Sequence, residues 1–249
     1  MTKQHSETFS IIMPCYNAAE YISVSIMSII SQTYPHWRLY VVDDCSTDNS
    51  YEIIQEISKN EPRIECIKLL VNSGVAVARN AGIMAARGKY IAFLDSDDIW
   101  VEKKLEYQLK FLESGYDVVC SNYKVFSGEI YNTLSIRNHP EEFNYNDMLC
   151  GNKIGNLTGV YNQVTLGKIY QEKKGHEDYI MWLDLIKKSK QAYCIQEVLA
   201  YYRVAKKSLS GNKLRASIWQ WNIYRKQLGF NVFKSAYYWF CYVNNALKR

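Results

Sequence analysis

The sequence has no long apolar run, no clustered cysteines and no common nucleotide-binding glycine motif. No stretch of about 18 apolar residues occurs among its 249 residues, which argues against a membrane-spanning helix. The seven cysteines show neither a CxxC pair nor a Cys/His metal spacing, so we expect free, buried thiols, as in a reducing cytosol. Neither the P-loop pattern nor GxGxxG is present, which disfavours NTPases and NAD enzymes.

Acidic residues are absent from the end of the chain. None of the 25 Asp and Glu residues follows Glu197, whereas ten of the 30 Lys and Arg residues do. Residues 1–197 therefore carry a net charge of −5 and residues 198–249 one of +10. A nucleic-acid-binding domain is usually basic throughout, so this division argues against nucleic acid as a partner.

The first hundred residues alternate strand and helix patterns. Strands are predicted at residues 9–13, 39–42, 64–69 and 90–94, and helices from 17 to about 31, up to about 59, and over 74–86. Asn17 and Glu20 are expected to form a capping box at the first helix. Repeated βα units predict an α/β fold with a largely parallel sheet, in which ligands bind beyond the carboxyl ends of the strands.

The remaining chain gives weaker patterns. Residues 121–174 show little periodicity and are predicted to form loops and short mixed strands. Residues 177–188 return to helical spacing, and residues 213–249 predict two helices separated near Gly229.

Carboxylates lie at the ends of two predicted strands. Asp95, Asp97 and Asp98 fall within four residues and repel one another unless a cation or hydrogen-bond donors neutralise them. Hard oxygen ligands of this kind suit Mg²⁺ or Mn²⁺, which would in turn hold a diphosphate. Asp43 and Asp44 close the second strand, where a carboxylate can accept from a ribose hydroxyl or a base N–H. For both groups, turn and helix-cap chemistry explains the pattern equally well.

Two further segments carry candidate polar groups. Small residues surround Arg79 between Gly74 and Gly82, and its guanidinium could neutralise a phosphate or an acidic loop. Glu177 and Asp178 open a predicted helix that contains Trp182. A carboxylate there, near an aromatic platform, could act as general base for a sugar hydroxyl, although acids that complement the helix dipole are an equal explanation.

In their order along the chain, these segments resemble the motifs of family 2 glycosyltransferases. The resemblance covers residues 8–211 and is carried by residues 11–17 (IIMPCYN), 42–48 (VDDCSTD), 72–80 (NSGVAVARN), 93–98 (FLDSDD), 176–182 (HEDYIMW), 202–204 (YRV) and 208–210 (SLS). It is strongest to bacterial members that build O-antigen, capsule and related surface polysaccharides. It implies a GT-A fold, which is a Rossmann-like sheet flanked by helices, an inverting mechanism and a UDP-linked sugar donor.

The resemblance also implies roles for individual residues. Asp178 is expected to be the catalytic base, with Glu177 and Trp182 on the acceptor side, and Asp97 with Asp95 is expected to bind Mn²⁺ or Mg²⁺. Contacts to the nucleotide sugar are expected from Pro14, Tyr16, Asn17, Asp43, Asp44, Arg79, Asp95, Ser96, Arg203 and Ser208. Arg203 and Ser208 would lie on a loop that closes over the diphosphate, although Ala205 stands where many relatives carry His.

The activity implied is transfer of one hexose, glucose or galactose, from a UDP-sugar to a glycan linked to undecaprenyl diphosphate. The QxxRW motif of processive synthases is absent, which argues for a single addition per encounter. A sugar-nucleotide pyrophosphorylase is an alternative, but its glycine-rich signature after the first strand is missing. A non-catalytic nucleotide-binding protein is another, which the combination of Asp95, Asp97 and Asp178 disfavours.

We expect a GT-A catalytic domain over residues 1–211, with a nucleotide-sugar half of about 1–100 and an acceptor half of about 101–211. A basic, aromatic helical tail follows at 212–249. In it, Phe230, Phe233, Tyr237 and Phe240 approximate the spacing of one helix face. This stripe can pack on the catalytic domain or lie on an anionic membrane. We expect both, and therefore a cytoplasmic enzyme that is peripheral on the inner face of the cytoplasmic membrane.

Overall fold

The structure, a computed structural model, describes residues 7–172, 176–204 and 213–247. Its elements are β1 (Phe9–Cys15), α1 (Ile22–Ile30), β2 (Trp37–Asp43), α2 (Ser50–Asn60), β3 (Ile64–Lys68), α3 (Val75–Ala85), β4 (Tyr90–Phe93), β5 (Ile99–Trp100), α4 (Lys104–Glu113), β6 (Val118–Phe126), β7 (Thr133–Arg137), β8 (Glu142–Asn144), α5 (Tyr145–Leu149), η1 (Asn156–Thr158), β9 (Val160–Asn162), α6 (Gln163–Leu166), α7 (Glu177–Ser189), β10 (Gln191–Arg203), α8 (Lys213–Asn222), the π-helical η2 (Ile223–Gln227) and α9 (Val232–Leu247). Within the described ranges, no helix combines the length and the apolar character that a membrane crossing requires.

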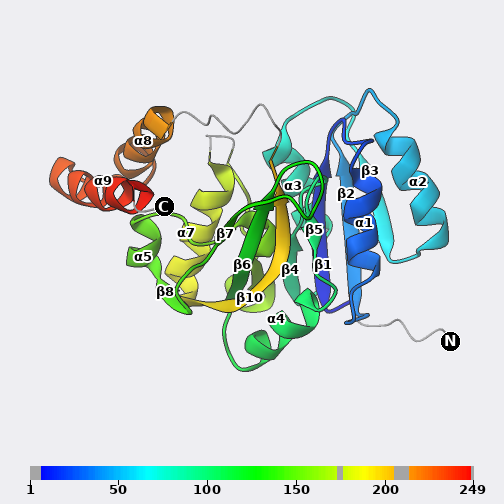
Figure 1. Cartoon of the computed structure of the whole chain (residues 1–249), viewed down its shortest axis with the longest axis horizontal. Coiled ribbons are helices and arrows are strands. Elements are labelled where there is room, and N and C mark those ends of the chain that lie inside the picture. The colour runs from blue at the N-terminus through cyan, green and yellow to red at the C-terminus, as the bar shows by residue number, and fades with distance from the viewer. Residues whose placement is uncertain (1–6, 173–175, 205–212, 248–249) are drawn as a thin grey trace.

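One mixed sheet runs through the molecule, with helices on both of its faces (Figure 1). Across the described residues its main strand order is β3-β2-β1-β4-β9-β6-β10-β5, and β7 and β8 pair with β6 and β10. Strands β1 to β4 are parallel, as predicted for the first hundred residues. Strand β9 then runs antiparallel between β4 and β6, so the second half of the sheet is mixed.

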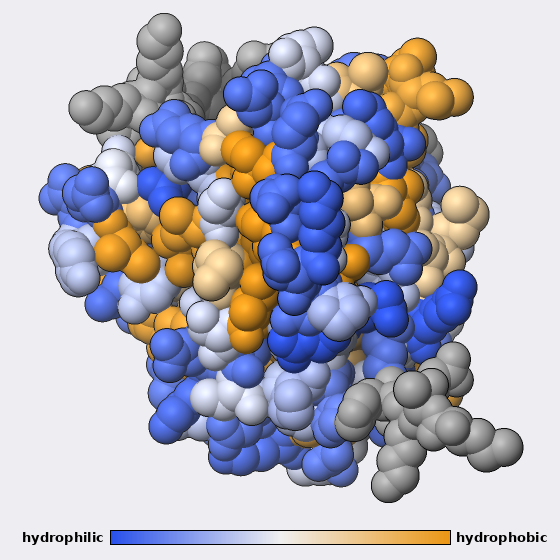
Figure 2. Space-filling model, turned by 90° about the vertical axis from the view of Figure 1, so that its right-hand side faces the viewer, coloured by the Kyte–Doolittle hydropathy of each residue, from blue (hydrophilic) through white to orange (hydrophobic). Residues whose placement is uncertain are grey.

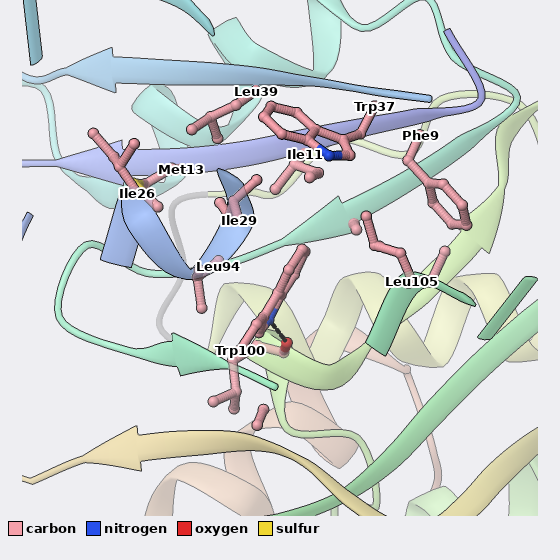
Figure 3. Close-up of a cluster of buried hydrophobic side chains, with 14 of the residues drawn as sticks. Phe9, Ile11, Met13, Ile26, Ile29, Trp37, Leu39, Leu94, Trp100 and Leu105 are labelled. Carbon is pink, nitrogen blue, oxygen red and sulfur yellow. Dashed lines mark hydrogen bonds between the residues drawn. The ribbon is translucent and has the colours of Figure 1, made fainter. Parts of the chain in front are cut away.

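The central strands are buried on both faces, and alternate residues supply two different cores. Phe9, Ile11 and Met13 of β1 face α1, α2 and α4, whereas Ile12 faces α3 and α7. This alternation is the period of two that a strand imposes. Figure 3 shows the first core, where Trp100 also donates from its indole Nε1 to the carbonyl oxygen of Leu157 over 2.7 Å. The side of the molecule near α2 is largely hydrophilic at its surface (Figure 2).

The predicted capping box of the first helix is wrong. Helix α1 begins after Tyr21 without a side-chain cap, and Asn17 lies outside it with a left-handed φ of 49°. The Asn17 side chain instead accepts from the backbone N–H of Thr47 over 2.8 Å. The side-chain oxygen of Asn17 therefore connects the loop after β1 to the loop after β2 and does not cap a helix.

The second half differs from the sequence prediction in its longest strands. The structure forms short strands and loops within residues 121–174, as predicted, but β6 and β10 are long strands that the periodicity did not reveal. The two tail helices are confirmed over the described residues, with Gly229 between them at a φ of 64°. The expectation of buried thiols holds for three cysteines only, because Cys45, Cys66, Cys150 and Cys241 are partly exposed.

The tail helices pack against α5, α7 and the turn after α5. Tyr224 is fully buried in the second core, and Asn245 donates to the carbonyl oxygen of Cys150 over 3.0 Å. The outer face of α9 remains exposed at Phe233, Tyr237 and Phe240. The expected domain boundary at 211/212 lies outside the described residues.

Candidate active site

The loops that follow β1, β2 and β4 meet at the carboxyl edge of the parallel strands. The backbone N–H of Asp44 donates to the carbonyl oxygen of Cys15 over 2.8 Å, and that of Leu94 donates to Ile12 over 3.1 Å. These ladder bonds bring the segments 14–17, 43–46 and 95–98 to one place, where an open α/β sheet binds its ligands.

A pocket of about 390 Å³ opens between these loops and the start of α3. We call it the Asp97 pocket. Six of the residues expected to contact a nucleotide sugar or its metal line it, namely Pro14, Tyr16, Asp44, Asp95, Ser96 and Asp97. Asn17, Asp43, Arg79 and Arg203 do not line this pocket, and Ser208 lies outside the described residues.

The two carboxylates after β2 are already engaged by backbone groups. Asp44 accepts from the N–H groups of Ser73 and Gly74, each over 2.8 Å. Asp43 is fully buried and accepts weakly from the N–H of Ser46. Asp44 thus joins the pocket wall to the start of α3 and keeps two lone-pair directions open, whereas Asp43 shapes the turn beneath it.

Arg79 pairs with Asp95 at the inner end of the pocket. Its Nη2 donates to Oδ1 of Asp95 over 2.6 Å, and Nη1 donates to the side-chain oxygen of Gln171 over 3.3 Å. The side chain of Arg79 is buried, and its Nε finds no hydrogen-bond partner within the described ranges of the chain. Burial lowers the pKa of this guanidinium, but the charge and hydrogen bond of Asp95 outweigh burial and raise it. Arg79 therefore remains charged and holds Asp95 in place.

The loop after Asp95 carries more negative charge than its neighbours neutralise. Burial raises the pKa of the Asp97 carboxyl, and the charge of Asp95 raises it further. Burial likewise raises the pKa of Asp98 well above its ordinary value, and no hydrogen-bond donor for its Oδ2 is found in the described part of the chain. A divalent cation would relieve this repulsion.

The donor set fits a cation that shares its coordination with the substrate. The described residues contain no group of three or more His, Cys, Asp or Glu side chains arranged for a metal. Asp97 and Asp95 nevertheless line the same pocket, and Mg²⁺ or Mn²⁺ is commonly held by one or two carboxylates together with phosphate oxygens and water. The residues present therefore suit a metal that binds together with a diphosphate.

Arg203 fixes this loop rather than lining the pocket. It is the last residue of β10, not part of a loop as expected. Its backbone N–H donates to Oδ1 of Asp98 over 2.8 Å, and its Nε donates to the carbonyl oxygen of Asp97 over 2.9 Å. The guanidinium also stacks between Tyr21 and Phe126, so in this structure Arg203 positions the two aspartates.

A second pocket of about 380 Å³ adjoins the first and contains Asp178. We call it the Asp178 pocket. Asp95 lines both pockets, so they meet at this carboxylate. Burial raises the pKa of Asp178, while Arg79 and the backbone N–H of Tyr179 oppose this effect. Asp178 lies in the first turn of α7, whereas its neighbour Glu177 does not line the pocket.

Trp182 lies behind the wall of the Asp178 pocket. Its ring is fully buried and packs edge-on against Phe93 and Tyr161. Its indole Nε1 donates to Oδ1 of Asn156 over 3.2 Å. The expectation of an aromatic platform for a sugar is therefore wrong for Trp182, because a ring with no exposed surface can act on the pocket only through Asn156.

Most of the wall of the Asp178 pocket could not be predicted from the sequence. The residues Tyr123, Asn152, Asn156 and Tyr202 line it. Among the residues that the structure describes, the buried Nδ2 of Asn156 has no hydrogen-bond partner. Tyr123 lies on β6, Tyr202 on β10, Asn152 in the loop before η1 and Asn156 at the start of η1, and periodicity is weak in all of these segments. The unpartnered amide of Asn156 is a hydrogen-bond donor at this pocket that a sugar hydroxyl can satisfy.

Comparison with known proteins gives consistent results. The sequence model of Glycosyl transferase family 2 matches residues 10–165. TuaG of Bacillus subtilis, named for teichuronic acid biosynthesis, is 37% identical over 242 residues, covering 96% of both chains. WfgD of Escherichia coli, named UDP-Glc:alpha-D-GlcNAc-diphosphoundecaprenol beta-1,3-glucosyltransferase, is 38% identical over 222 residues, covering 86% of this chain and 84% of WfgD.

Two solved structures share the fold. Staphylococcus aureus TarS 1–349 in complex with UDP-GlcNAc aligns with a TM-score of 0.69 and 24% identity, over 79% of this chain and 58% of that one. The mannosyltransferase PcManGT of Pyrobaculum calidifontis, in complex with GDP-Man and Mn²⁺, aligns with a TM-score of 0.70 and 16% identity, over 92% and 66%. The sheet and its helices are thus those of GT-A enzymes, which commonly use divalent metals.

Proposed function

The chain belongs to glycosyl transferase family 2, and we propose that it moves one hexose from a UDP-sugar to a hydroxyl group of a lipid-linked glycan, with inversion at the anomeric carbon. Glucose and galactose are the favoured sugars, and the acceptor is linked to undecaprenyl diphosphate. The printed activity of WfgD supports a donor and an acceptor of this kind. The names of WfgD and TuaG also support a place in bacterial surface-polysaccharide synthesis, of the O-antigen or capsule type.

The observation that carries this proposal is the meeting of the Asp97 pocket and the Asp178 pocket at Asp95. A donor diphosphate near Asp97 places the anomeric carbon at the junction of the two pockets. An acceptor hydroxyl near Asp178 then approaches the opposite face of that carbon. A single displacement with one base inverts the configuration, by the same logic as single-step glycoside hydrolysis.

Asp178 acts as the general base in this reaction. A neutral alcohol is a weak nucleophile, and its proton moves to the Asp178 carboxylate as the new bond forms. Asn156 orients the entering sugar through its side-chain amide. The charge of Arg79 opposes the rise that burial causes in the pKa of Asp178. Glu177 lies beside Asp178 in the first turn of α7.

Asp97, assisted by Asp95, holds Mn²⁺ or Mg²⁺ together with the donor diphosphate. When bound, the cation stabilises the negative charge that grows on the departing UDP. Arg203 holds the carbonyl group of Asp97 and the carboxylate of Asp98 in place through one hydrogen bond to each. Pro14, Tyr16 and Asp44 form the nucleoside end of the pocket, and Asn17 and Asp43 shape its loops. Ser96 lies on the diphosphate side, and a contact of Ser208 with the diphosphate belongs to the same proposal.

The tail places the enzyme on the inner face of the cytoplasmic membrane as a peripheral protein. Exposed Phe233, Tyr237 and Phe240 lie on a helix without acidic residues. Such a face suits the interface of an anionic bilayer. In this view the catalytic domain is residues 1–211 and the tail is residues 212–249.

The decisive experiment is a panel of UDP-sugars against synthetic diphospholipid-linked GlcNAc and GalNAc acceptors, with products identified by mass spectrometry and their anomeric configuration by NMR. One UDP-hexose should give a product of inverted configuration. Asp178→Asn and Asp97→Asn should each lower kcat by at least a hundredfold. Asp184→Asn, on the exposed face of the same helix α7, is the matched control and should keep activity. Retained configuration, or activity that survives both substitutions, would overturn the mechanism.

A further inference from the structure

A third pocket of about 410 Å³ lies where the tail meets the catalytic domain. We call it the tail pocket. Its walls come from Tyr123 of β6, Arg137 of β7, the turn after α5 and the C-terminal half of α9, which contributes Tyr242 and Asn245. None of the roles assigned above uses it.

The tail pocket continues the Asp178 pocket. Tyr123 and Asn152 line both, just as Asp95 lines both the Asp97 and Asp178 pockets. The three pockets therefore form a series, with the Asp178 pocket in the middle. A molecule that places a hydroxyl at Asp178 can extend past Tyr123 and Asn152 into the tail pocket without crossing the donor.

The sign of the charge changes along this series. The Asp97 pocket is lined by three aspartates, as is the Asp178 pocket. No carboxylate lines the tail pocket, and Arg137 is the cation in its wall. Across the described residues, Arg137 has no carboxylate within ion-pair distance. Its planar guanidinium can therefore take both oxygens of a phosphate.

The pocket wall is built by specific contacts between the two parts of the chain. Asn245 donates to Cys150 over 3.0 Å, and Tyr238 donates to the side chain of Asn146 over 3.0 Å. Tyr242 passes close to Gly151, since a Cβ there would meet its ring at 3.8 Å. The tail thus forms one wall of a polar pocket in addition to covering apolar surface.

We propose that the tail pocket binds the diphosphate of the lipid-linked acceptor, with Arg137 as the residue that pairs with its phosphate oxygens. This inference rests on the proposed function, because a glycan linked through a diphosphate carries that group on the far side of its sugar from the accepting hydroxyl. With the hydroxyl at Asp178, the diphosphate falls on the side away from the donor, where the lining is cationic. Arg137 is then a specificity-determining residue, and the tail completes the acceptor site.

Three acceptors test the proposal, each with the same terminal sugar and the same short alkyl chain. One is linked through a diphosphate, one through a monophosphate and one as a neutral glycoside. They are assayed in detergent without anionic lipid, so that phospholipid headgroups do not contribute. The unmodified enzyme should have a higher kcat/KM for the diphosphate than for the neutral glycoside. Arg137→Gln should lower kcat/KM for the diphosphate about tenfold to a hundredfold, since a charge-assisted hydrogen bond is lost.

The accompanying readouts separate this role from a structural one. Arg137→Gln should leave the KM for the UDP-sugar and kcat/KM for the neutral glycoside unchanged, and Arg137→Lys should restore part of the preference. Lys226→Gln removes the same charge from an exposed tail position and should change nothing in detergent. An Arg137→Gln enzyme that keeps its preference for the diphosphate, or that loses all three acceptors equally, would overturn the proposal.

A direct measurement of acceptor binding tests the site without requiring sugar transfer. Calorimetry should show that the diphosphate compound binds the unmodified protein more tightly than Arg137→Gln, in the presence of UDP. If no donor and acceptor pair gives product, the proposed function fails. Even then, equal affinity of the two proteins for the diphosphate compound would contradict the site, and a difference would support it.

Discussion

At the scale of single residues, Arg79 links the two pockets that hold the proposed donor and base. It donates to Asp95 over 2.6 Å, and its charge lowers the pKa of Asp178 against the effect of burial. A general base must be deprotonated, so any rise in the pKa of Asp178 narrows the pH range of activity. In the proposed mechanism Arg79 therefore influences proton transfer through Asp178 and acts as a positioning residue.

Replacing Arg79 should move the acidic limb of the pH profile. In Arg79→Gln the opposing positive charge is lost, so the pKa of Asp178 rises and the fall of kcat/KM at low pH should begin on the order of one pH unit higher. Arg79→Lys keeps the charge and should leave the limb within a fraction of a unit, even if kcat falls. The measurement is kcat/KM from pH 4.5 to 8.5. A limb that stays in place in Arg79→Gln would show that Arg79 does not influence the base.

At the scale of elements, α3 brings Arg79 to the pocket through a close contact with the sheet. Its start is fixed by Gly74, whose φ is 92°, and by the two hydrogen bonds to Asp44. Farther along, Gly82 lets the helix approach β1, because a Cβ there would lie 2.6 Å from Cγ2 of Ile12. The close approach sets how far Arg79 reaches toward Asp95.

Gly82→Ala should therefore destabilise the protein, although alanine favours helices. Overpacking of this kind costs about 1–3 kcal/mol, which exceeds the gain of about 1 kcal/mol in helix propensity. Urea unfolding measures the loss, and Met84→Ala, at an exposed position of the same helix, should change little. In an Ile12→Ala background the cost of Gly82→Ala should shrink, because the clashing methyl is gone. If Gly82→Ala lowered the free energy of unfolding equally in both backgrounds, the strain would not come from the contact with Ile12.

The elements also show how far the sequence could predict the fold and the site. Strands β1, β2 and β4 are predictable because they are short apolar runs, buried on both faces, that each end at a turn signal. Strand β3, at the edge of the sheet, is only partly buried but still forms a short run between turns. Strand β10 is not predictable, because its pairing with β6 shifts register between Ile195 and Ala200 and so breaks the period of two. The carboxylates at strand ends could be named in advance. Asn156 and Arg137 could not, because they lie on the short 3-10 helix η1 and on the half-exposed strand β7, within the segment of weak periodicity.

At the scale of the whole molecule, α9 presents different side chains on its two sides. Tyr242 and Asn245 face the body and line the tail pocket, whereas Phe233, Tyr237 and Phe240 are 86%, 64% and 69% exposed. Helical spacing places these two groups on opposite faces of the helix. Acceptor binding and membrane binding can therefore be altered separately.

The exposed aromatic face should control binding to an anionic membrane. Replacing Phe233, Tyr237 and Phe240 together with Ser removes most of the apolar surface that could enter the interface, and even partial burial of each ring contributes on the order of 1 kcal/mol. Sedimentation with phosphatidylglycerol vesicles should show at least tenfold weaker binding, while transfer to a water-soluble acceptor stays unchanged because the inner face of α9 is untouched. The control replaces three exposed apolar residues away from the tail, Leu70, Val71 and Met84, with Ser. This control should leave vesicle binding intact. Because Lys and Arg in the tail are not balanced by acids, raising the salt concentration should weaken binding of the unmodified protein as well. Vesicle binding that survives the triple replacement would mean that this face meets something other than a bilayer.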